Sequence, residues 1–115
     1  WRLDPHPANR AGYHATPWVP PYDMPYRTLL PLGIENLLVA GRCHSATSEA
    51  LASSRVTATA MGMGQAAGIA AAMAVQGERS PREIKVSDLQ SKLLQAGCIL
   101  EPPDAEERIV AQPRW

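Results

Sequence analysis

The sequence predicts an α/β fold in which a short buried strand precedes a long, uncharged helix. Residues 37–40 form a short apolar run between turn residues, which is typical of a buried strand. Residues 56–75 carry no charged side chain and consist mainly of alanine and glycine, which indicates a buried helix about 30 Å long. In open α/β sheets, ligands bind at the carboxyl ends of strands, and helix N-termini favour negative charge. The order of the two elements therefore predicts a ligand site between them.

The composition limits both the size of the core and the classes of function. A chain of 115 residues has room for one domain, and its 45% hydrophobic content includes much alanine and no phenylalanine. Little apolar area is buried per residue in such a chain, so we expect a piece of a larger domain or a subunit completed by a partner. Zero net charge, with both signs interleaved, argues against a nucleic-acid binder. Two cysteines are too few for a disulfide framework or a zinc site, and no secretory signal is visible, so a cytoplasmic location is expected.

The elements before the strand are predicted to be irregular. Residues 1–25 are rich in proline and aromatic side chains, and proline both removes an N–H donor and restricts the preceding residue. This segment should be extended chain and turns, and residues 26–32 should be another extended piece, so that the domain holds one or two buried strands. A turn follows at residues 32–36, with Gly33 at the position that requires a positive φ.

The elements after the strand are predicted to be helical. Residues 41–54 are polar, with a helical turn over residues 48–52. Gly77 suits the C′ position at the end of the long helix. A second, short helix should run from an N-cap at Ser87 to residue 96, since Gln90 completes a capping box with Ser87.

Three interpretations of residues 56–75 compete. A membrane span has this length, but the segment lacks the leucine, isoleucine and phenylalanine that insertion requires. A dinucleotide-binding G-x-G-x-x-A series begins at Gly62, but no strand and turn precede it. The third interpretation is a buried helix, because Gly64, Gly68 and Ala72 share one face and permit close approach of another backbone. We favour the third, which predicts that another element crosses this face.

Four motifs then occur in a recognisable order. They are D-P-H-P at residues 4–7, Y-D-M-P-Y-R-T-L at 22–29, G-R-C-H-S-A-T-S-E-A at 41–50 and G-Q-A-A-G at 64–68. Over residues 3–97 the chain resembles the C-terminal part of FAD-dependent oxidoreductases of glutathione-reductase-like fold. Members of that family carry D-x-H-P, Y-x-I-P-Y-R-S-L, A-G-R-x-x-S-A-T-H-E-A and G-Q-A-A-G. Each motif alone is a weak signal, whereas the ordered series is specific.

The resemblance implies part of a Rossmann-like FAD-binding domain. Residues 1–35 would end a substrate-domain segment, residues 36–100 would form the C-terminal portion of the FAD-binding domain, and residues 101–115 would be a tail. The strand would lead into contacts with the phosphate and ribityl region, and the helix N-terminus would face the pyrimidine edge of the isoalloxazine. The cofactor-binding candidates are Gly41, Arg42, Ser45, Arg55, Val56 and Thr57. No metal ligand is expected, and no catalytic residue is assigned.

Several alternatives stay open at this point. Arg42 would bind the cofactor or pair with Glu49, and Arg55 would stabilise negative charge near the flavin, bind a substrate carboxylate or form a structural ion pair. His44 would be an acid–base group, since its pKa in water lies near neutrality, or a structural residue. Ser48 stands where relatives often carry histidine.

The departures from the family pattern limit what this chain can do alone. No strand–glycine-rich turn–helix unit is present in the 115 residues, so we expect no activity, and little or no FAD binding, from this chain by itself. The implied partners are a small-molecule substrate and the remaining half of the FAD-binding domain, in cis or in trans. No membrane is expected, and the sequence leaves homo-oligomerisation open. The alternative function is a non-catalytic interaction subunit that packs on a partner through the Gly/Ala helix.

Overall fold

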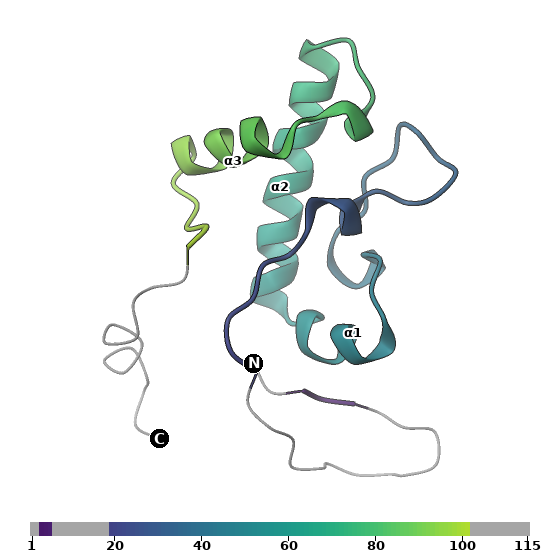
Figure 1. Ribbon diagram of the computed structural model, residues 1–115, viewed down its shortest axis with the longest axis vertical. Helices are drawn as coiled ribbons and strands as arrows, with labels where there is room; N and C mark the ends of the chain where they lie inside the picture. Colours follow the sequence, from purple (N-terminus) through teal and green to yellow (C-terminus); the bar gives the residue numbers. More distant parts are fainter. Residues whose placement is uncertain (1–2, 6–18, 102–115) are drawn as a thin grey trace.

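A computed structural model describes residues 3–5 and 19–101, and the regular structure in this part of the chain is helical (Figure 1). Three α-helices and three short 3₁₀ turns occur in the described residues. In chain order the elements are η1 (Tyr26–Leu29), η2 (Gly41–Cys43), α1 (Ser48–Ser54), α2 (Thr57–Gln76), η3 (Pro81–Glu83) and α3 (Val86–Gln95). Most of the predicted extended N-terminal segment, and nearly all of the predicted tail, lie outside the described residues.

The predicted α/β fold class is wrong for the described residues, which contain no strand. Residues 37–40 are not part of a ladder, and Leu37 is 43% exposed. The backbone N–H of Val39 donates to the carbonyl oxygen of Leu29 at 2.9 Å, which is a single link. A strand requires repeated pairing with a neighbouring extended segment, and the described residues place none beside this run. The Rossmann-like buried strands are therefore absent from this part of the chain.

The long helix is confirmed, with its boundaries shifted by one residue. Helix α2 begins after Val56, which is its N-cap in extended conformation, and ends at Gln76 with Gly77 as the C-cap. The left-handed backbone position is taken by Glu78, with φ of 48°, rather than by Gly77. Space around Gly77 is tight, because an added Cβ would lie 2.8 Å from the Nε atom of the flexible Arg79 side chain and 3.1 Å from the backbone carbonyl oxygen of Met73.

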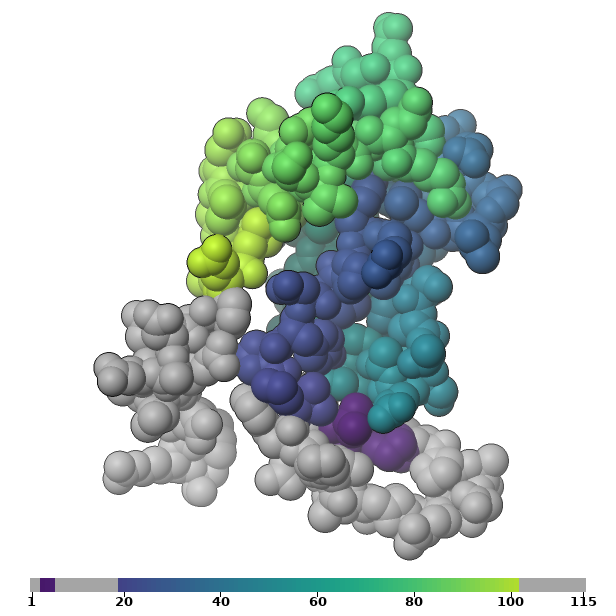
Figure 2. Space-filling view, viewed as in Figure 1, coloured from purple at the N-terminus to yellow at the C-terminus, as the bar shows by residue number. Residues whose placement is uncertain are grey.

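One face of α2 forms the core together with α3. Ala70 and Ala74 are buried against Leu89 and Leu93 of α3 and against Ile84, which follows η3. Alanine on α2 lets the leucines of α3 approach closely, so small and large residues alternate across this contact. In Figure 2 the segment that starts at residue 19 and the helix α3 lie over α2 on the side that faces the viewer.

The short helices have caps that the sequence predicted only in part. Helix α1 covers the predicted turn and extends it to Ser54, with the hydroxyl of Thr47 accepting the N–H of Ala50 at 3.2 Å. The predicted N-cap of α3 is wrong, because that helix begins after Lys85. A capping box does occur, but in η3, where Ser80 and Glu83 satisfy each other's backbone N–H groups. Ser87 with Gln90 and Ser80 with Glu83 both fit the capping-box pattern of the sequence. Of the two elements, only η3 has a proline at its first position.

The opposite face of α2 is uncovered in the described part of the chain. A Cβ added at Gly64 or at Gly68 would meet nothing within 4 Å. Met61 is 71% exposed and Val75 is 79% exposed. The prediction that another element crosses this face is therefore wrong for the described residues. By length and composition alone α2 could also cross a membrane, a property that core helices of soluble proteins share.

Candidate functional site

The two regions that the sequence predicted to converge do lie side by side. Turn η2 packs against α2, and a Cβ added at Gly41 would lie 3.7 Å from the Cβ of Ala60 in the first turn of the helix. Gly41 has a φ of 66°, a backbone conformation that residues with a Cβ rarely adopt. The backbone conformation of the turn therefore favours glycine at this position, while an added Cβ would make only an ordinary contact with α2.

The amino end of α2 offers uncapped donors. Val56 provides no side-chain cap, and the first backbone bond of the helix runs from the N–H of Ala60 to the carbonyl oxygen of Val56 at 3.0 Å. The N–H groups of the first turn carry a partial positive charge of about half an elementary charge. Thr57 is exposed. An electron-rich group would be stabilised at this end of the helix.

Arg55 has a partner within the chain. Its Nη2 atom lies 2.8 Å from the Oδ2 atom of Asp4 and 2.7 Å from the Asp4 carbonyl oxygen. The backbone N–H of Asp4 donates to the carbonyl oxygen of Ala52 at 3.0 Å. The guanidinium thus ties the segment around Asp4 to the corner between α1 and α2. This geometry matches the structural alternative for Arg55, while its role toward a cofactor stays a prediction.

Arg42 and Ser45 are exposed on and just after turn η2. The backbone N–H of Ser45 donates to the carbonyl oxygen of Thr28 at 2.8 Å, which joins the turn to η1. Among the described ion pairs none involves Arg42, so the expected alternative of a pair with Glu49 is not formed there. Arg42 is thus a cation beside the turn that has no ion-pair partner in this part of the chain.

His44 is the residue near the site whose placement the sequence did not resolve. Its side chain is 6% exposed, and its two ring nitrogens contact the Gly41 carbonyl oxygen and the Ser54 hydroxyl. A histidine in a polar stretch gives no sequence signal for this, because Ser54 comes ten residues later on another element. Only the packing of α1 against the turn brings the two residues together.

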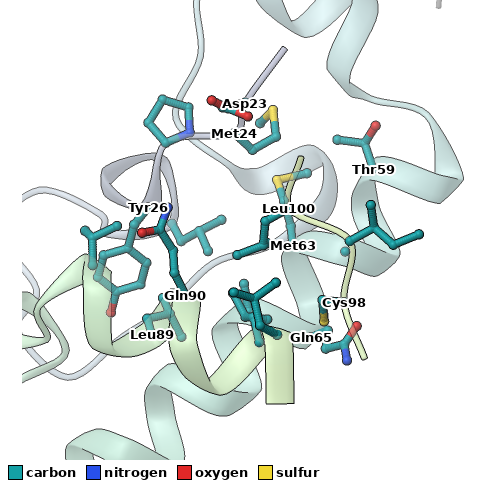
Figure 3. A pocket seen from close by; sticks show the side chains of 18 of the residues that line it. Asp23, Met24, Tyr26, Thr59, Met63, Gln65, Leu89, Gln90, Cys98 and Leu100 are labelled. Atoms are coloured by element: carbon teal, nitrogen blue, oxygen red, sulfur yellow. The ribbon is translucent and has the colours of Figure 1, made fainter. Parts of the chain in front are cut away.

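A wide hollow of about 1030 Å³ lies on the other flank of α2 (Figure 3). Its walls come from the segment around η1, from the amino half of α2, and from α3 with the residues that follow it. The side chains are mostly apolar, and those labelled in the close-up are Asp23, Met24, Tyr26, Thr59, Met63, Gln65, Leu89, Gln90, Cys98 and Leu100. Burial raises the pKa of the Tyr26 hydroxyl, which donates to the carbonyl oxygen of Pro81 at 2.8 Å.

No metal site is formed by the described residues, which contain no group of three or more metal-ligating side chains. Cys43 is exposed and Cys98 is half-buried, and both are free thiols. The glycines Gly62 and Gly64 lie inside α2 rather than in a turn after a strand. The expectation that this series is not a dinucleotide-binding turn is therefore confirmed.

Comparison with known proteins gives the family. Residues 1–93 match the family described as FAD dependent oxidoreductase. The chain belongs to this family. No curated protein and no solved structure matches the chain.

The exposed hydrogen-bond donors near turn η2 and the start of α2 can be compared with the groups that FAD presents. The exposed cation of Arg42, the glycine turn and the uncapped N-terminus of α2 are donors suited to phosphate, hydroxyl and carbonyl oxygens. The Gly-rich turn that cradles a pyrophosphate before a helix has no counterpart in the sequence. The described residues therefore offer donors for such oxygen atoms without a turn of that kind.

Proposed function

We propose that this chain supplies the ribityl and isoalloxazine side of the flavin site in an FAD-dependent oxidoreductase. The observation that carries the proposal is the contact between Gly41 and the first turn of α2, which puts the turn and the helix N-terminus beside each other. Family membership gives the chemistry, because FAD exchanges a hydride with a substrate C–H.

The residues at this place have distinct proposed roles. Arg42 and the backbone around Gly41 would bind phosphate and ribityl oxygens, with Ser45 as a further donor. The N–H groups at Val56 and Thr57 would stabilise negative charge on the pyrimidine edge of the reduced flavin, since they lie at the positive end of the helix dipole. Arg55 would contribute its charge from the adjacent corner, where it also holds Asp4.

The proposed flavin site also requires a dinucleotide-binding unit, which the described elements do not include. The dinucleotide-binding unit would come from the remaining part of the FAD-binding domain, in cis or in trans, and the uncovered face of α2 is available for that contact. The chain alone would then be inactive. Assignment to the glutathione-reductase-like members, with a small-molecule substrate and a cytoplasmic location, is also part of the proposal and is supported by the order of the motifs and the composition.

A second candidate function is favoured by the same uncovered face. Gly64, Gly68 and the exposed Met61 and Val75 give α2 a smooth apolar surface without charge. A non-catalytic subunit would use this surface to pack on a partner and would bind no flavin. Measurement of flavin content separates the two functions.

The experiment compares two glycine substitutions. The chain is co-expressed with a polypeptide that carries a strand–Gly-rich turn–helix unit encoded beside it, and the bound flavin is quantified from its visible absorbance after purification. Gly41→Val should abolish FAD retention, because a branched side chain would keep the turn away from the cofactor. Gly33→Val is the matched control, since Gly33 also has a positive φ, of 75°, but lies in another loop with nothing within 4 Å of an added Cβ.

The outcomes are distinct. Loss of FAD in Gly41→Val alone, with similar melting temperatures for both variants, supports the placement. Stoichiometric flavin in Gly41→Val contradicts it. A colourless wild-type complex favours the non-catalytic subunit.

A further inference from the structure

His44 links turn η2 to helix α1 through both of its ring nitrogens. The Nδ1 atom lies 2.6 Å from the carbonyl oxygen of Gly41, and the Nε2 atom lies 3.0 Å from the Oγ atom of Ser54. The ring is buried, as is Ser54, which is 2% exposed. Buried polar atoms are costly unless they are hydrogen-bonded, so these two contacts account for the whole polar capacity of the imidazole.

The acceptor at Gly41 fixes which nitrogen carries the hydrogen. A carbonyl oxygen only accepts, so the Nδ1 atom of His44 must be the donor in this contact. The Ser54 hydroxyl has a single hydrogen, and its Oγ atom also lies 2.9 Å from the carbonyl oxygen of Ala50. Directed to Nε2, that hydrogen leaves a neutral ring that is protonated at Nδ1. Directed to Ala50, it leaves the Oγ atom only able to accept, so the Nε2 contact is a hydrogen bond only if Nε2 also carries a hydrogen; Nδ1 is the donor to Gly41 in both arrangements.

The orientation of the Gly41 carbonyl also fixes the direction of the next backbone N–H, that of Arg42. The Gly41 carbonyl oxygen accepts from Nδ1 and also from the backbone N–H of His44 at 3.2 Å. In a planar trans peptide the N–H points opposite to the C=O, so the N–H of Arg42 is turned away from His44. Within the described residues this N–H has no hydrogen-bond acceptor.

We propose that His44 is a positioning residue: it holds the Gly41 carbonyl and thereby presents the Arg42 N–H as a donor to a phosphate or ribityl oxygen of the flavin. The proposal rests on the proposed function, in which turn η2 faces the cofactor. It assigns to His44 no acid–base role, because both ring nitrogens are used within the chain.

Two substitutions of His44 each keep only one of the two contacts that the ring nitrogens make. In His44→Asn the side-chain amide nitrogen is as many bonds from the Cα atom as Nδ1 is, so it keeps a donor for the Gly41 carbonyl. In His44→Gln the amide nitrogen matches Nε2 instead, so the contact with Ser54 is kept, while the Gly41 carbonyl loses its side-chain donor and keeps only the backbone N–H of His44. Ser54→Ala is the matched control, because it removes the Ser54 contact and leaves Nδ1 on Gly41.

The first measurement needs no flavin. Nitrogen NMR of the histidine rings in the 115-residue chain should show a protonated Nδ1 for His44, assigned by comparison with His44→Asn. The amide resonance of Arg42 should shift in His44→Gln and stay close to that of the wild type in Ser54→Ala. An unprotonated Nδ1 in the wild type would overturn the proposal.

The second measurement is the FAD dissociation constant of the assembled flavoprotein. We expect it to rise about tenfold in His44→Gln, as loss of one hydrogen bond implies, and to change less than about threefold in His44→Asn and Ser54→Ala. If the loss of affinity follows the fall in melting temperature across all three variants, His44 is merely structural and the proposal is wrong. If the assembled wild type binds no FAD, the proposed function fails, and the NMR measurement alone then decides whether His44 holds the Gly41 carbonyl.

Discussion

The two faces of α2 are built from the same small residues and yet have opposite environments. Ala70 is fully buried against α3, whereas Gly68, two positions earlier, has open space where its Cβ would be. Neither face carries a charged side chain, so nothing in the helix itself marks one side as the solvent side. The environment of each face is therefore set by the residues that pack on it. The leucines of α3 cover one face, and no described residue covers the glycines on the other.

This contrast explains why the helix alone is a poor guide to function. Its packed face holds the small core of the chain, and its amino end lies beside the turn at Gly41. Its uncovered face is apolar, because Met61 and Val75 are large apolar side chains that are mostly exposed.

The largest effect is expected from the packed face. Leu89→Ala removes a side chain that is 3% exposed and should lower the free energy of unfolding by about 2–5 kcal/mol, since it leaves a cavity against α2. Urea denaturation of the chain measures the change. Leu94→Ala on the same helix is the control, because Leu94 is 57% exposed and should change stability by less than about 0.5 kcal/mol. Equal losses would mean that α3 does not pack on α2 through Leu89.

The most direct comparison places the same side chain on both faces. Ala70→Leu should destabilise the chain by about 1–3 kcal/mol, because the site has no room for a larger side chain. Gly68→Leu should instead stabilise it by about 0.5–1 kcal/mol, since leucine is the better helix former and meets no neighbour. Thermal unfolding of both variants gives the signs. A loss of stability in Gly68→Leu would show that this face is covered in solution.

Tyr26 gives a pH-dependent test of the packed side, where it lies against the core cluster. Burial raises the pKa of its hydroxyl above the ordinary value of 10.0. A raised pKa in the folded state means that this contribution to stability is complete below pH 10 and is lost as pH rises through the folded-state value.

Tyr26→Phe should therefore remove part of the alkaline fall in melting temperature. It should also cost about 0.5–1.5 kcal/mol near neutral pH through loss of the bond to Pro81. Melting curves recorded from neutral to alkaline pH provide the measurement. Tyr22→Phe is the control for the loss near neutral pH, since it removes a hydroxyl that donates to Ser53 rather than to Pro81. An unchanged alkaline profile in Tyr26→Phe would contradict the burial of this hydroxyl.

The smallest effect is expected at the corner before α2. The side chains of Asp4 and Arg55 are 44% and 31% exposed, so their ion pair should contribute about 0.2–1 kcal/mol and weaken with added salt. A double-mutant cycle with Asp4→Ala and Arg55→Ala measures the coupling. A coupling that does not respond to salt would argue for a desolvated pair and for a tighter corner than the structure has.

The elements differ in how far the sequence predicted them. The boundaries of α2 follow from local properties: an uncharged run of good helix formers ended by glycine is enough to specify a helix. Gly33 has the expected positive φ for the same reason, since only its own backbone is involved. The predicted cap of α3 failed because the helix begins at Val86, which places Ser87 inside its first turn rather than before it.

The strand at residues 37–40 failed for a different reason. An apolar run predicts extended backbone, but a strand exists only through pairing with a neighbour, and that partner is not a property of the run itself. The expected crossing at Gly64 and Gly68 failed in the same way, because the pattern shows that close approach is permitted and not what approaches.

By itself the sequence determined the long helix, the positive φ of Gly33 and, through the order of its motifs, the FAD-dependent oxidoreductase family. Only the tertiary structure decided which face of α2 is packed, that Arg55 is held by Asp4, and that His44 lies between Gly41 and Ser54. The physical reason is that helix propensity and backbone φ act over a few residues, whereas burial and hydrogen-bond partners depend on residues far apart in the chain.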